Sequence, residues 1–265
     1  MPRAHRYFIP GHVWHITHRC HQQEFLLKFA RDRRQWRHWL FEARKRFGLS
    51  ILNYTITSNH IHLLVRDTGK DVIPKSLQLI AGRTAQEYNQ RKGRKGAFWE
   101  DRYHATAVDT DAHLAKCLVY IDLNMVRAGV VSHPCDWFDG GYREIQQPTT
   151  RYRVIDQQAL LALFGFSNGP DFQQIHRQWV EAELKADTTQ RQPFWTESLA
   201  VGRKEFVQDV QAQLGASAMV RAVIDEAEHF VLKEPPASYT GHLGQKNTPL
   251  SLENSYIWND KVSLS

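Results

Sequence analysis

The feature that most constrains the fold is a hairpin pattern at residues 49–67, LSILNYTITSNHIHLLVRD. Two runs rich in apolar and β-branched residues flank a polar pair at residues 58–59, which predicts two strands joined by a tight turn. Side chains two apart along a strand point to the same face, so His60 and His62 share one face and Ile61 lies on the other. Two neutral imidazoles side by side are suited to bind a metal ion. For this pattern alone, a pair of histidines on a solvated strand face is the alternative.

The bulk composition indicates a protein of the cytoplasm. The chain of 265 residues is long enough for one catalytic domain with a smaller addition. It has no apolar run near 18 residues, and its N-terminal sequence MPRAHRYFIPGH lacks the apolar centre of a signal peptide, so no membrane segment is expected. The three cysteines form no Cys-x-x-Cys pair, which argues against a disulfide framework and a cysteine zinc site.

Positive charge is concentrated in the first part of the chain. Residues 1–150 hold 23 Lys and Arg against 14 Asp and Glu, a net charge of +9, and residues 151–265 hold 11 against 14, a net charge of −3. This distribution indicates a polyanionic partner for the first part, and a solvated basic surface is the alternative.

Periodicity predicts the order of strands and helices. It gives strands at residues 11–19, within 49–67 (two) and at 103–108, and helices at residues 31–47, 72–89 and 109–129. Two of the helices cross between strands, which favours an α+β fold with a ferredoxin-like, four-stranded antiparallel sheet. In such a sheet the histidine strand lies inside, with its histidines on the face away from the two crossover helices.

The last of these helices has two distinct faces. Leu114, Leu118, Ile121 and Met125 form a buried stripe, and a different face carries a polar row of His113, Lys116, Tyr120, Asn124 and Arg127. No packing argument requires a tyrosine and an asparagine one turn apart. An ordinary solvated helix face is the alternative for this row alone.

A basic segment, RKGRKG at residues 91–96, interrupts the pattern and is followed by the aromatic-rich FWEDRY. Cations beside aromatic rings are typical of surfaces that bind single-stranded nucleic acid. The alternative is that Phe98 and Trp99 anchor the segment in the core. The arginines of the helix at residues 31–47 are interpreted as a solvated face.

The second part of the chain is predicted to be a mainly helical region. Residues 146–153 have the composition of a linker, and residues 233–265, rich in Pro, Gly, Asn and Ser, that of an extended tail. Between them, residues 154–232, we expect helices at residues 156–164, 172–184, 204–214 and 219–232.

Three motifs in this order, NHIHLLV, GRKGAFWEDRYHATAV and YIDLNMVRAGVV, resemble those of the single-tyrosine HUH transposases and are most similar to the REP-associated tyrosine transposases of bacteria. The resemblance covers residues 1–145 nearly end to end, and the remainder more loosely through GRKEFVQDV and residues 232–258. It implies that residues 1–145 are a catalytic domain of the HUH endonuclease fold.

The family resemblance also implies a chemistry and its residues. Tyr120 matches the family's nucleophile, which forms a 5′-phosphotyrosine with DNA, and His60 and His62 match the two metal-binding histidines. Asn124 matches the third metal ligand, and Mg²⁺ or Mn²⁺ suits this neutral ligand set. His104 is a candidate for a further ligand or a base.

The partner that the resemblance implies is single-stranded DNA that forms imperfect palindromic hairpins. We expect a monomer rather than a dimer, in the bacterial cytoplasm and associated with the nucleoid when bound to DNA. Candidate DNA contacts are Arg91, Lys92, Arg94, Lys95, Trp99, Lys116 and Arg127. Two alternatives stay open: a catalytically silent protein that binds DNA hairpins, and a metal-dependent hydrolase in which Tyr120 is incidental.

The chain departs from the family pattern at three places. Ser58 stands where proline is usual before the Asn-His pair, and Met125 stands where proline commonly follows the asparagine. Neither change removes a catalytic atom. The glycine pair in DWFDGGY replaces a more usual serine pair, which leaves the role of that loop open.

Overall fold

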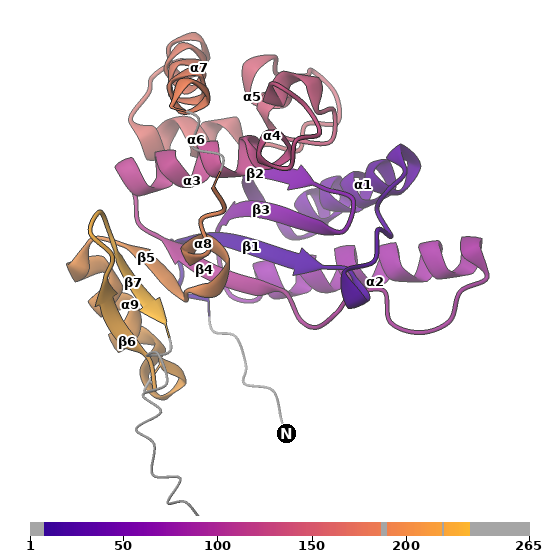
Figure 1. Cartoon of the computed structure of the whole chain (residues 1–265), viewed down its shortest axis with the longest axis horizontal. Coiled ribbons are helices and arrows are strands. Elements are labelled where there is room, and N and C mark those ends of the chain that lie inside the picture. Colours follow the sequence, from indigo (N-terminus) through magenta and orange to yellow (C-terminus); the bar gives the residue numbers. More distant parts are fainter. Residues whose placement is uncertain (1–7, 187–189, 219, 234–265) are drawn as a thin grey trace, which may run out of the picture. The chain divides into compact units, whose positions relative to one another are not determined.

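The first half of the chain folds as the predicted succession of strands and helices (Figure 1). Its elements are β1 (Val13–Arg19), α1 (Ala30–Phe47), β2 (Ser50–Ile56), β3 (His60–Arg66), α2 (Val72–Lys92), β4 (His104–Val108) and α3 (Ala112–Asp122). The four strands lie in the order β2-β3-β1-β4, and each neighbouring pair is antiparallel. The predicted α+β fold with a ferredoxin-like sheet is therefore confirmed, and the histidine strand β3 lies inside the sheet.

The computed structural model describes residues 8–186, 190–218 and 220–233. These belong to one unit, residues 1–235, and a second unit, residues 236–265, lies outside the described residues. The tail predicted at residues 233–265 stays a prediction, because only its first residue is described. Within the described residues, no helix is long and apolar enough to cross a membrane.

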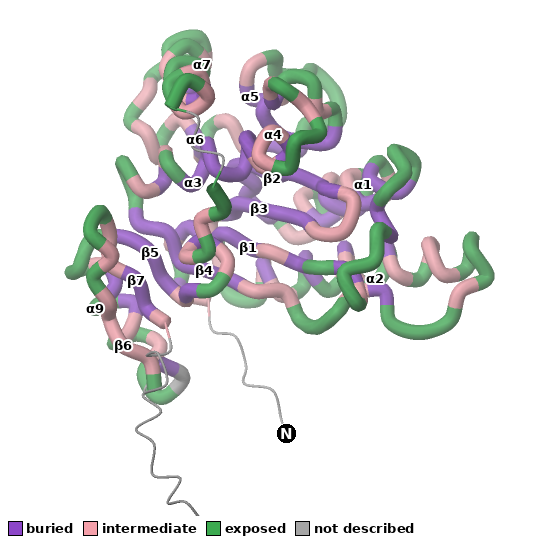
Figure 2. Tube along the Cα trace, in the orientation of Figure 1, coloured by how far each residue is buried: buried purple, intermediate pink, exposed green. Residues whose placement is uncertain are grey.

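Different helices cover the two faces of the sheet. On one face, α1 and α2 bury an apolar stripe that includes Trp36, Leu40 and Ile80, and Figure 2 shows this burial along the strands and the inner sides of the helices. On the other face, the hydroxyl of Thr55 in β2 donates to the carbonyl of Ile121 in α3 at 2.9 Å. Thr55 pairs directly with His62, so α3 lies on the histidine face of the sheet.

The predicted helix at residues 109–129 is wrong as one element, because it is broken at Leu123. The chain continues from α3 into a separate short helix, α4 (Asn124–Arg127). In an unbroken helix the amide of Asn124 donates to the carbonyl of Tyr120. Here the guanidinium of Arg127 donates to that carbonyl. A side chain has replaced a backbone donor, which a periodicity argument does not foresee.

The second part of the chain adds helices and also strands. The predicted helices at residues 156–164, 172–184 and 204–214 are confirmed as α6 (Gln157–Phe164), α7 (Gly169–Lys185) and α9 (Lys204–Leu214). The short elements are α5 (Tyr142–Gln146), α8 (Phe194–Glu197) and 3-10 helices at His21–Gln23, Pro134–Asp136 and Gly215–Ala218. The helix predicted at residues 219–232 is wrong: this segment forms a hairpin of β6 (Ala222–Asp225) and β7 (Phe230–Lys233).

These strands extend the first sheet. β5 (Ala200–Gly202) pairs in parallel with β4 and antiparallel with β7, so the described sheet has seven strands in the order β2-β3-β1-β4-β5-β7-β6. Val154 and Ile155, which follow the predicted linker at residues 146–153, are buried in the same core as β1. The region predicted as a mainly helical addition at residues 154–232 thus shares a sheet and a core with the first part.

Candidate functional site

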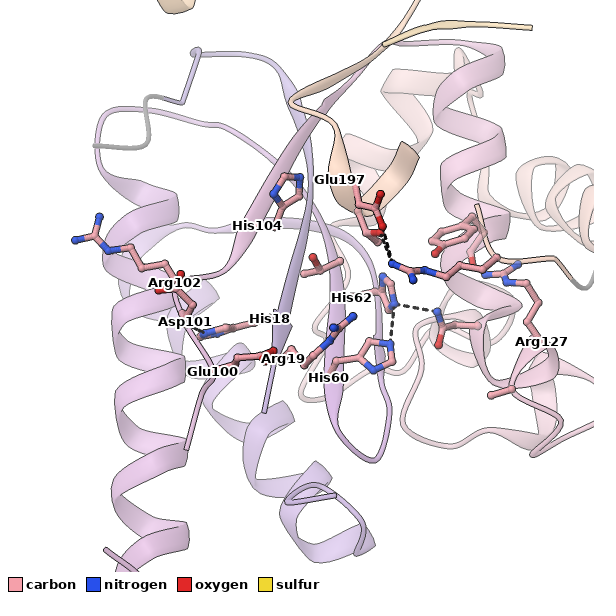
Figure 3. Close-up of a pocket in the computed structure, with 16 residues that line it drawn as sticks. His18, Arg19, His60, His62, Glu100, Asp101, Arg102, His104, Arg127 and Glu197 are labelled. Atoms are coloured by element: carbon pink, nitrogen blue, oxygen red, sulfur yellow. Dashed lines mark hydrogen bonds and ion pairs between the residues drawn. The ribbon is translucent and has the colours of Figure 1, made fainter. Parts of the chain in front are cut away.

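A cavity of about 730 Å³ opens on the histidine face of the sheet (Figure 3). Its walls come from β1, β3, the segment before β4, α3 and α4, and from the segment around α8 in the second part of the chain. Three of the residues predicted as metal ligands, and the predicted nucleophile, line this one cavity: His60, His62, Asn124 and Tyr120.

The three predicted ligands converge on one point. The Nε2 atoms of His60 and His62 lie 3.1 Å apart, and the side-chain nitrogen of Asn124 lies 2.9 Å from Nε2 of His62. Alternation along β3 accounts for the two histidines, and the break after α3 directs Asn124 toward them. Asn124 is thus a neighbour of the two histidines, although more than 60 positions separate it from them in the sequence.

A buried hydrogen-bond chain sets the protonation of His62. The carbonyl of Trp195 only accepts hydrogen bonds, so Nδ1 of His15, 2.9 Å away, carries a proton. Burial lowers the pKa of His15 to about 3, so the ring is neutral and its Nε2 accepts. That atom lies 2.9 Å from Nδ1 of His62, which therefore donates. The lone pair of His62 remains on Nε2, facing His60.

Local contacts set the protonation of His60 in the same way. The hydroxyl of Thr57 donates its proton to the backbone carbonyl of His60 at 2.9 Å. The hydroxyl oxygen of Thr57 therefore accepts from Nδ1 of His60, which lies 3.0 Å away. The side-chain oxygen of Asn59 accepts from that Nδ1 as well, at 2.7 Å. The proton of His60 is therefore on Nδ1, and its lone pair is on Nε2.

The two lone pairs make a site for a cation. Burial lowers the pKa of His60 to about 4 and that of His62 well below its ordinary value of 6.5, so both rings are neutral at pH 7. Two facing lone pairs repel each other unless a positive charge binds both. Two adjacent ligands of an ion bound at roughly 2.1 Å lie about 3 Å apart, so the observed 3.1 Å fits such an ion.

The donor set is neutral, with two imidazoles and the amide of Asn124. An amide offers either its nitrogen or its oxygen on a half-turn of its terminal bond, and the oxygen is the metal ligand. Among the described residues, no group of three or more His, Cys, Asp or Glu side chains is arranged as a metal site. The candidate centre therefore depends on Asn124 for its third ligand.

Tyr120 lies beside this centre and is nearly covered. Its side chain is 5 % exposed, and its ring centre lies 5.8 Å from that of His62 and 6.1 Å from that of Trp195. The guanidinium carbon of Arg127 lies 4.2 Å from the ring centre. Burial raises the pKa of the phenol, and the charge of Arg127 lowers it in part. The phenol is protonated at neutral pH.

Charged side chains of both signs line the cavity. The cations are Arg19, Arg102, Arg127 and Arg191, and the carboxylates are Glu100, Asp101 and Glu197, of which Glu197 forms an ion pair with Arg191 at 3.0 Å. A site with these guanidinium groups beside a neutral ligand set is suited to an anionic substrate such as a phosphodiester.

Most of the predicted DNA contacts lie away from the cavity. The predicted loop at residues 91–96 is wrong at its start, because Arg91 and Lys92 belong to α2. Arg91 forms an ion pair with Asp32, and Arg94 lies 3.6 Å from Glu24. The ammonium group of Lys92 lies over the ring of Phe29, and Lys95 is exposed.

The remaining predicted contacts differ in their surroundings. Trp99 stacks on His18 with ring centres 4.1 Å apart and donates to the carbonyl of Ala81, so it anchors its segment to α2. Lys116 pairs with Glu228 at 2.7 Å on an exposed surface. Of the seven predicted contacts, Arg127 is the one that lines the cavity, among the residues described.

His104 lines the cavity but is not part of the metal centre. It pairs with Thr17, which pairs on its other side with His62, so two strand spacings, roughly 10 Å, separate the two histidine backbones. Its Nε2 lies 2.9 Å from the carbonyl of Ser198. Because that carbonyl can only accept a hydrogen bond, Nε2 of His104 carries the proton here and is not free to bind a metal ion.

Sequence reasoning missed several residues of the site. His15 shares a strand face with Thr17, and that alternation was a usable signal once the pairing of β1 with β3 was known. Trp195, Arg191 and Glu197 come from the second part of the chain, about 70 positions after Tyr120. No local pattern around them indicates an active site.

Comparison with known proteins identifies one family model that matches part of the chain. Residues 10–124 match the family model described as IS200-like transposase, a segment that includes all four converging residues. A search of curated proteins found no match.

Two solved structures are similar. One is a REP-associated tyrosine transposase bound to a REP hairpin, with 20 % identity, a TM-score of 0.47 and coverage of 59 % of this chain and 94 % of that one. The other is a candidate transposase from Deinococcus radiodurans R1, with 13 % identity, a TM-score of 0.33 and coverage of 48 % of this chain and 97 % of that one.

Proposed function

We propose, from the match of residues 10–124 to the IS200-like transposase family model, that the chain is a REP-associated tyrosine transposase that cleaves and rejoins single-stranded DNA. The observation that carries the proposal is the convergence of His60, His62 and Asn124 beside Tyr120 in one arginine-lined cavity. Each of the four supplies a group that phosphodiester cleavage requires.

His60, His62 and Asn124 would hold a divalent ion, Mg²⁺ or Mn²⁺. When bound, such an ion takes up negative charge on the phosphate oxygens. The buried tautomer chain through His15 keeps the Nε2 lone pair of His62 available at all times, so no proton must leave before binding. The exposed and cavity-lining arginines, Arg19 and Arg191, would bind the non-bridging oxygens of the substrate.

The cleavage step transfers the phosphoryl group to the chain. The oxygen of Tyr120 attacks phosphorus, a phosphorus–oxygen bond forms, and the bond to the 3′ oxygen of the preceding nucleotide breaks. The phenol loses its proton and the departing 3′ oxygen gains one, so the number of bound protons does not change. Arg127 stabilises the phenolate that forms, because its charge lies over the ring. The new 5′-phosphotyrosine conserves the bond energy for rejoining.

The substrate that we propose is single-stranded DNA with imperfect palindromic hairpins, on the strength of the motifs at residues 59–65, 93–108 and 120–131. The active unit that we propose is a monomer, in which Tyr120 meets His60, His62 and Asn124 of the same chain. Its proposed location is the bacterial cytoplasm, in association with the nucleoid when it is bound to DNA. The net charge of +9 over residues 1–150 suits a polyanion.

The test is a cleavage assay with Mn²⁺ and an oligonucleotide that carries a REP-like hairpin and a label at either end. The wild-type protein is expected to give a slow-migrating covalent adduct that retains the 3′ label, and EDTA is expected to abolish it. Tyr120→Phe, which keeps the ring and removes the nucleophile, is expected to give none. If Tyr120→Phe cleaves at most of the wild-type rate, the chain is a metal-dependent hydrolase instead.

A catalytically silent protein that binds DNA hairpins is the second candidate. The observation that favours it is the 5 % exposure of Tyr120, since a nucleophile must meet its substrate. DNA retarded on a native gel without an adduct, across several hairpins and both metal ions, would establish this candidate and contradict the transposase activity.

A further inference from the structure

A second cavity, of about 510 Å³, lies between α1, β2, the loop that precedes α5 and residues 147–154. Among the described residues, none lines both this cavity and the one at Tyr120. Its distinguishing side chains are four arginines and two exposed aromatic rings. We call it the arginine groove, and define it by Arg34, Arg37, Arg143, Arg151, Phe138 and Tyr152.

The arginine groove carries unbalanced positive charge. Among the described residues that line it, Glu144 supplies the one carboxyl group against four guanidinium groups, and its charge acts on Arg37. Its Oε1 accepts the backbone amides of Val154 and Ile155 at 2.7 and 2.9 Å. By contrast, the basic segment at residues 91–94, which sequence reasoning favoured for DNA, has acidic partners in Asp32 and Glu24. The arginine groove is therefore the better candidate of these two cationic surfaces.

Two rings in the groove are exposed to an unusual degree. Phe138 is 67 % exposed and Tyr152 is 78 % exposed. Large apolar rings left in water forgo a burial free energy of about 2 kcal/mol each, so such a pair beside arginines has the character of a binding surface. The guanidinium carbon of Arg143 lies 3.9 Å from the ring centre of Phe138, so the cation and the ring are neighbours in the groove.

The backbone holds this arrangement in place. The amide of Gly141 donates to the carbonyl of Tyr54 at 2.7 Å, and Gly140 forms a bridge to Thr55 on the edge strand β2. A Cβ atom at Gly141 would lie 2.2 Å from the side-chain oxygen of Asn53. The glycine pair that departs from the family pattern thus permits the loop to lie against β2. Arg37 in turn donates to the carbonyl of Phe138 at 3.1 Å.

We propose that the arginine groove is a second binding site for single-stranded DNA, separate from the cleavage site. Its arginines bind phosphates, and unpaired bases stack on Phe138 and Tyr152. Charge alone also suits an acidic protein or a duplex. The exposed rings favour the single strand, because unpaired bases offer faces for stacking that paired bases in a helix do not. Only the choice of DNA as the ligand of this groove rests on the proposed function.

The test measures binding with metal ions chelated, so that it is independent of cleavage. Fluorescence anisotropy in EDTA compares the full-length protein with Arg34→Glu/Arg151→Glu and with Phe138→Ser/Tyr152→Ser. The probes are a dT20 oligonucleotide and a blunt-ended DNA hairpin. Both double variants are expected to bind dT20 at least tenfold more weakly, and the charge variant is expected to have a shallower salt dependence.

The matched control is Lys75→Glu/Lys204→Glu, which makes the same change of charge at two exposed positions outside both cavities. It is expected to weaken dT20 binding by less than threefold. Because every substituted groove side chain is exposed, the unfolding temperature should match that of the wild type. Affinity for dT20 within twofold of wild type in either groove variant overturns the proposal. A loss confined to the blunt hairpin also overturns it, since the groove would then hold paired DNA.

Discussion

Nε2 of His15 and Nδ1 of His62 form a hydrogen bond of 2.9 Å between two neighbouring strands, beneath the candidate metal centre. His15 is itself held by the carbonyl of Trp195 in the second part of the chain. This contact determines which nitrogen of His62 carries a proton, and so which one is free for a metal ion. Through His15, the second part of the chain thereby sets the protonation of His62, a predicted metal ligand in the first part.

His15 is expected to act as a positioning residue for metal binding. His15→Phe keeps the bulk and removes the acceptor for His62, so the affinity for Mn²⁺ should fall by about 10- to 100-fold. His15→Gln retains one donor and one acceptor, so its affinity for Mn²⁺ should lie close to that of the protein with His15. Isothermal titration with Mn²⁺ in the Tyr120→Phe background measures this without turnover. Thr106→Val is the control, since it removes a hydroxyl that lies 3.1 Å from the same Trp195 carbonyl and 2.6 Å from that of Ser198, and leaves the contact of His15 in place. Equal affinities in all these variants would contradict the assignment.

The rate of cleavage should rise with pH well above neutrality. Burial raises the pKa of Tyr120, so the phenolate fraction increases tenfold per pH unit below that pKa. Arg127→Leu removes the charge that opposes this shift, so its profile should move to higher pH and its rate at pH 8 should drop by about tenfold. Arg127→Lys should lie between the two. Single-turnover rates from pH 6 to 10 give the profiles, and an unchanged profile in Arg127→Leu would contradict a role in stabilising the phenolate.

Acid should destabilise the fold through its buried imidazoles. The pKa of His15 in the folded chain is lowered to about 3, so between about pH 6.5 and 3 the unfolded chain binds the proton and the folded chain does not. Stability from this group is therefore present at pH 7 and lost as pH falls, by about 3 kcal/mol at pH 4. Urea unfolding of wild type and His15→Gln at both pH values tests this. The variant should lose less stability than the wild type on acidification, whereas parallel losses would assign the effect to other groups.

The glycine pair should tolerate no side chain at its second position. Gly141→Ala would bring a Cβ to 2.2 Å from the Asn53 oxygen and 3.0 Å from Ile155, so a loss of about 1–3 kcal/mol in unfolding free energy is expected. Gly82→Ala is the matched control, because a Cβ there meets nothing within 4 Å and replaces glycine inside α2. That control should gain up to about 1 kcal/mol. Chemical denaturation measures both, and equal stabilities would show that the loop can move away from β2.

The first part of the fold could be predicted because its information is local. Alternation in β3 assigned His60 and His62 to one face, and helical spacing assigned Tyr120 and Asn124 to a common row. The short connection between β2 and β3 requires them to pair, and the longer helical connections then leave few arrangements for β1 and β4. These constraints sufficed for the sheet order, and the family resemblance supplied the assignment of the four residues to one site.

The remaining features depend on contacts that no local pattern encodes. At the break before Asn124, a side-chain donor on Arg127 takes the place of a backbone amide, and periodicity records only where apolar residues fall. Residues 219–232 contain apolar positions that suit a helix or a hairpin, and the open edge of β4, extended by β5, selects the strands. From the sequence, the arginines of α1 were interpreted as a solvated face. Arg143 and Arg151, which line the same groove, lie about a hundred positions further along the chain.

The parallel pairing of β5 with β4 has a consequence for the order of events during synthesis. When a ribosome has translated residues 1–150, Tyr120 and the proposed metal ligands His60, His62 and Asn124 have been made, but Arg191, Trp195 and β5 have not. His15 then has no carbonyl to bind, and the edge of the sheet at β4 is open. The hydrogen bond that leaves Nε2 of His62 free for a metal ion can therefore form only after residue 195 has been translated.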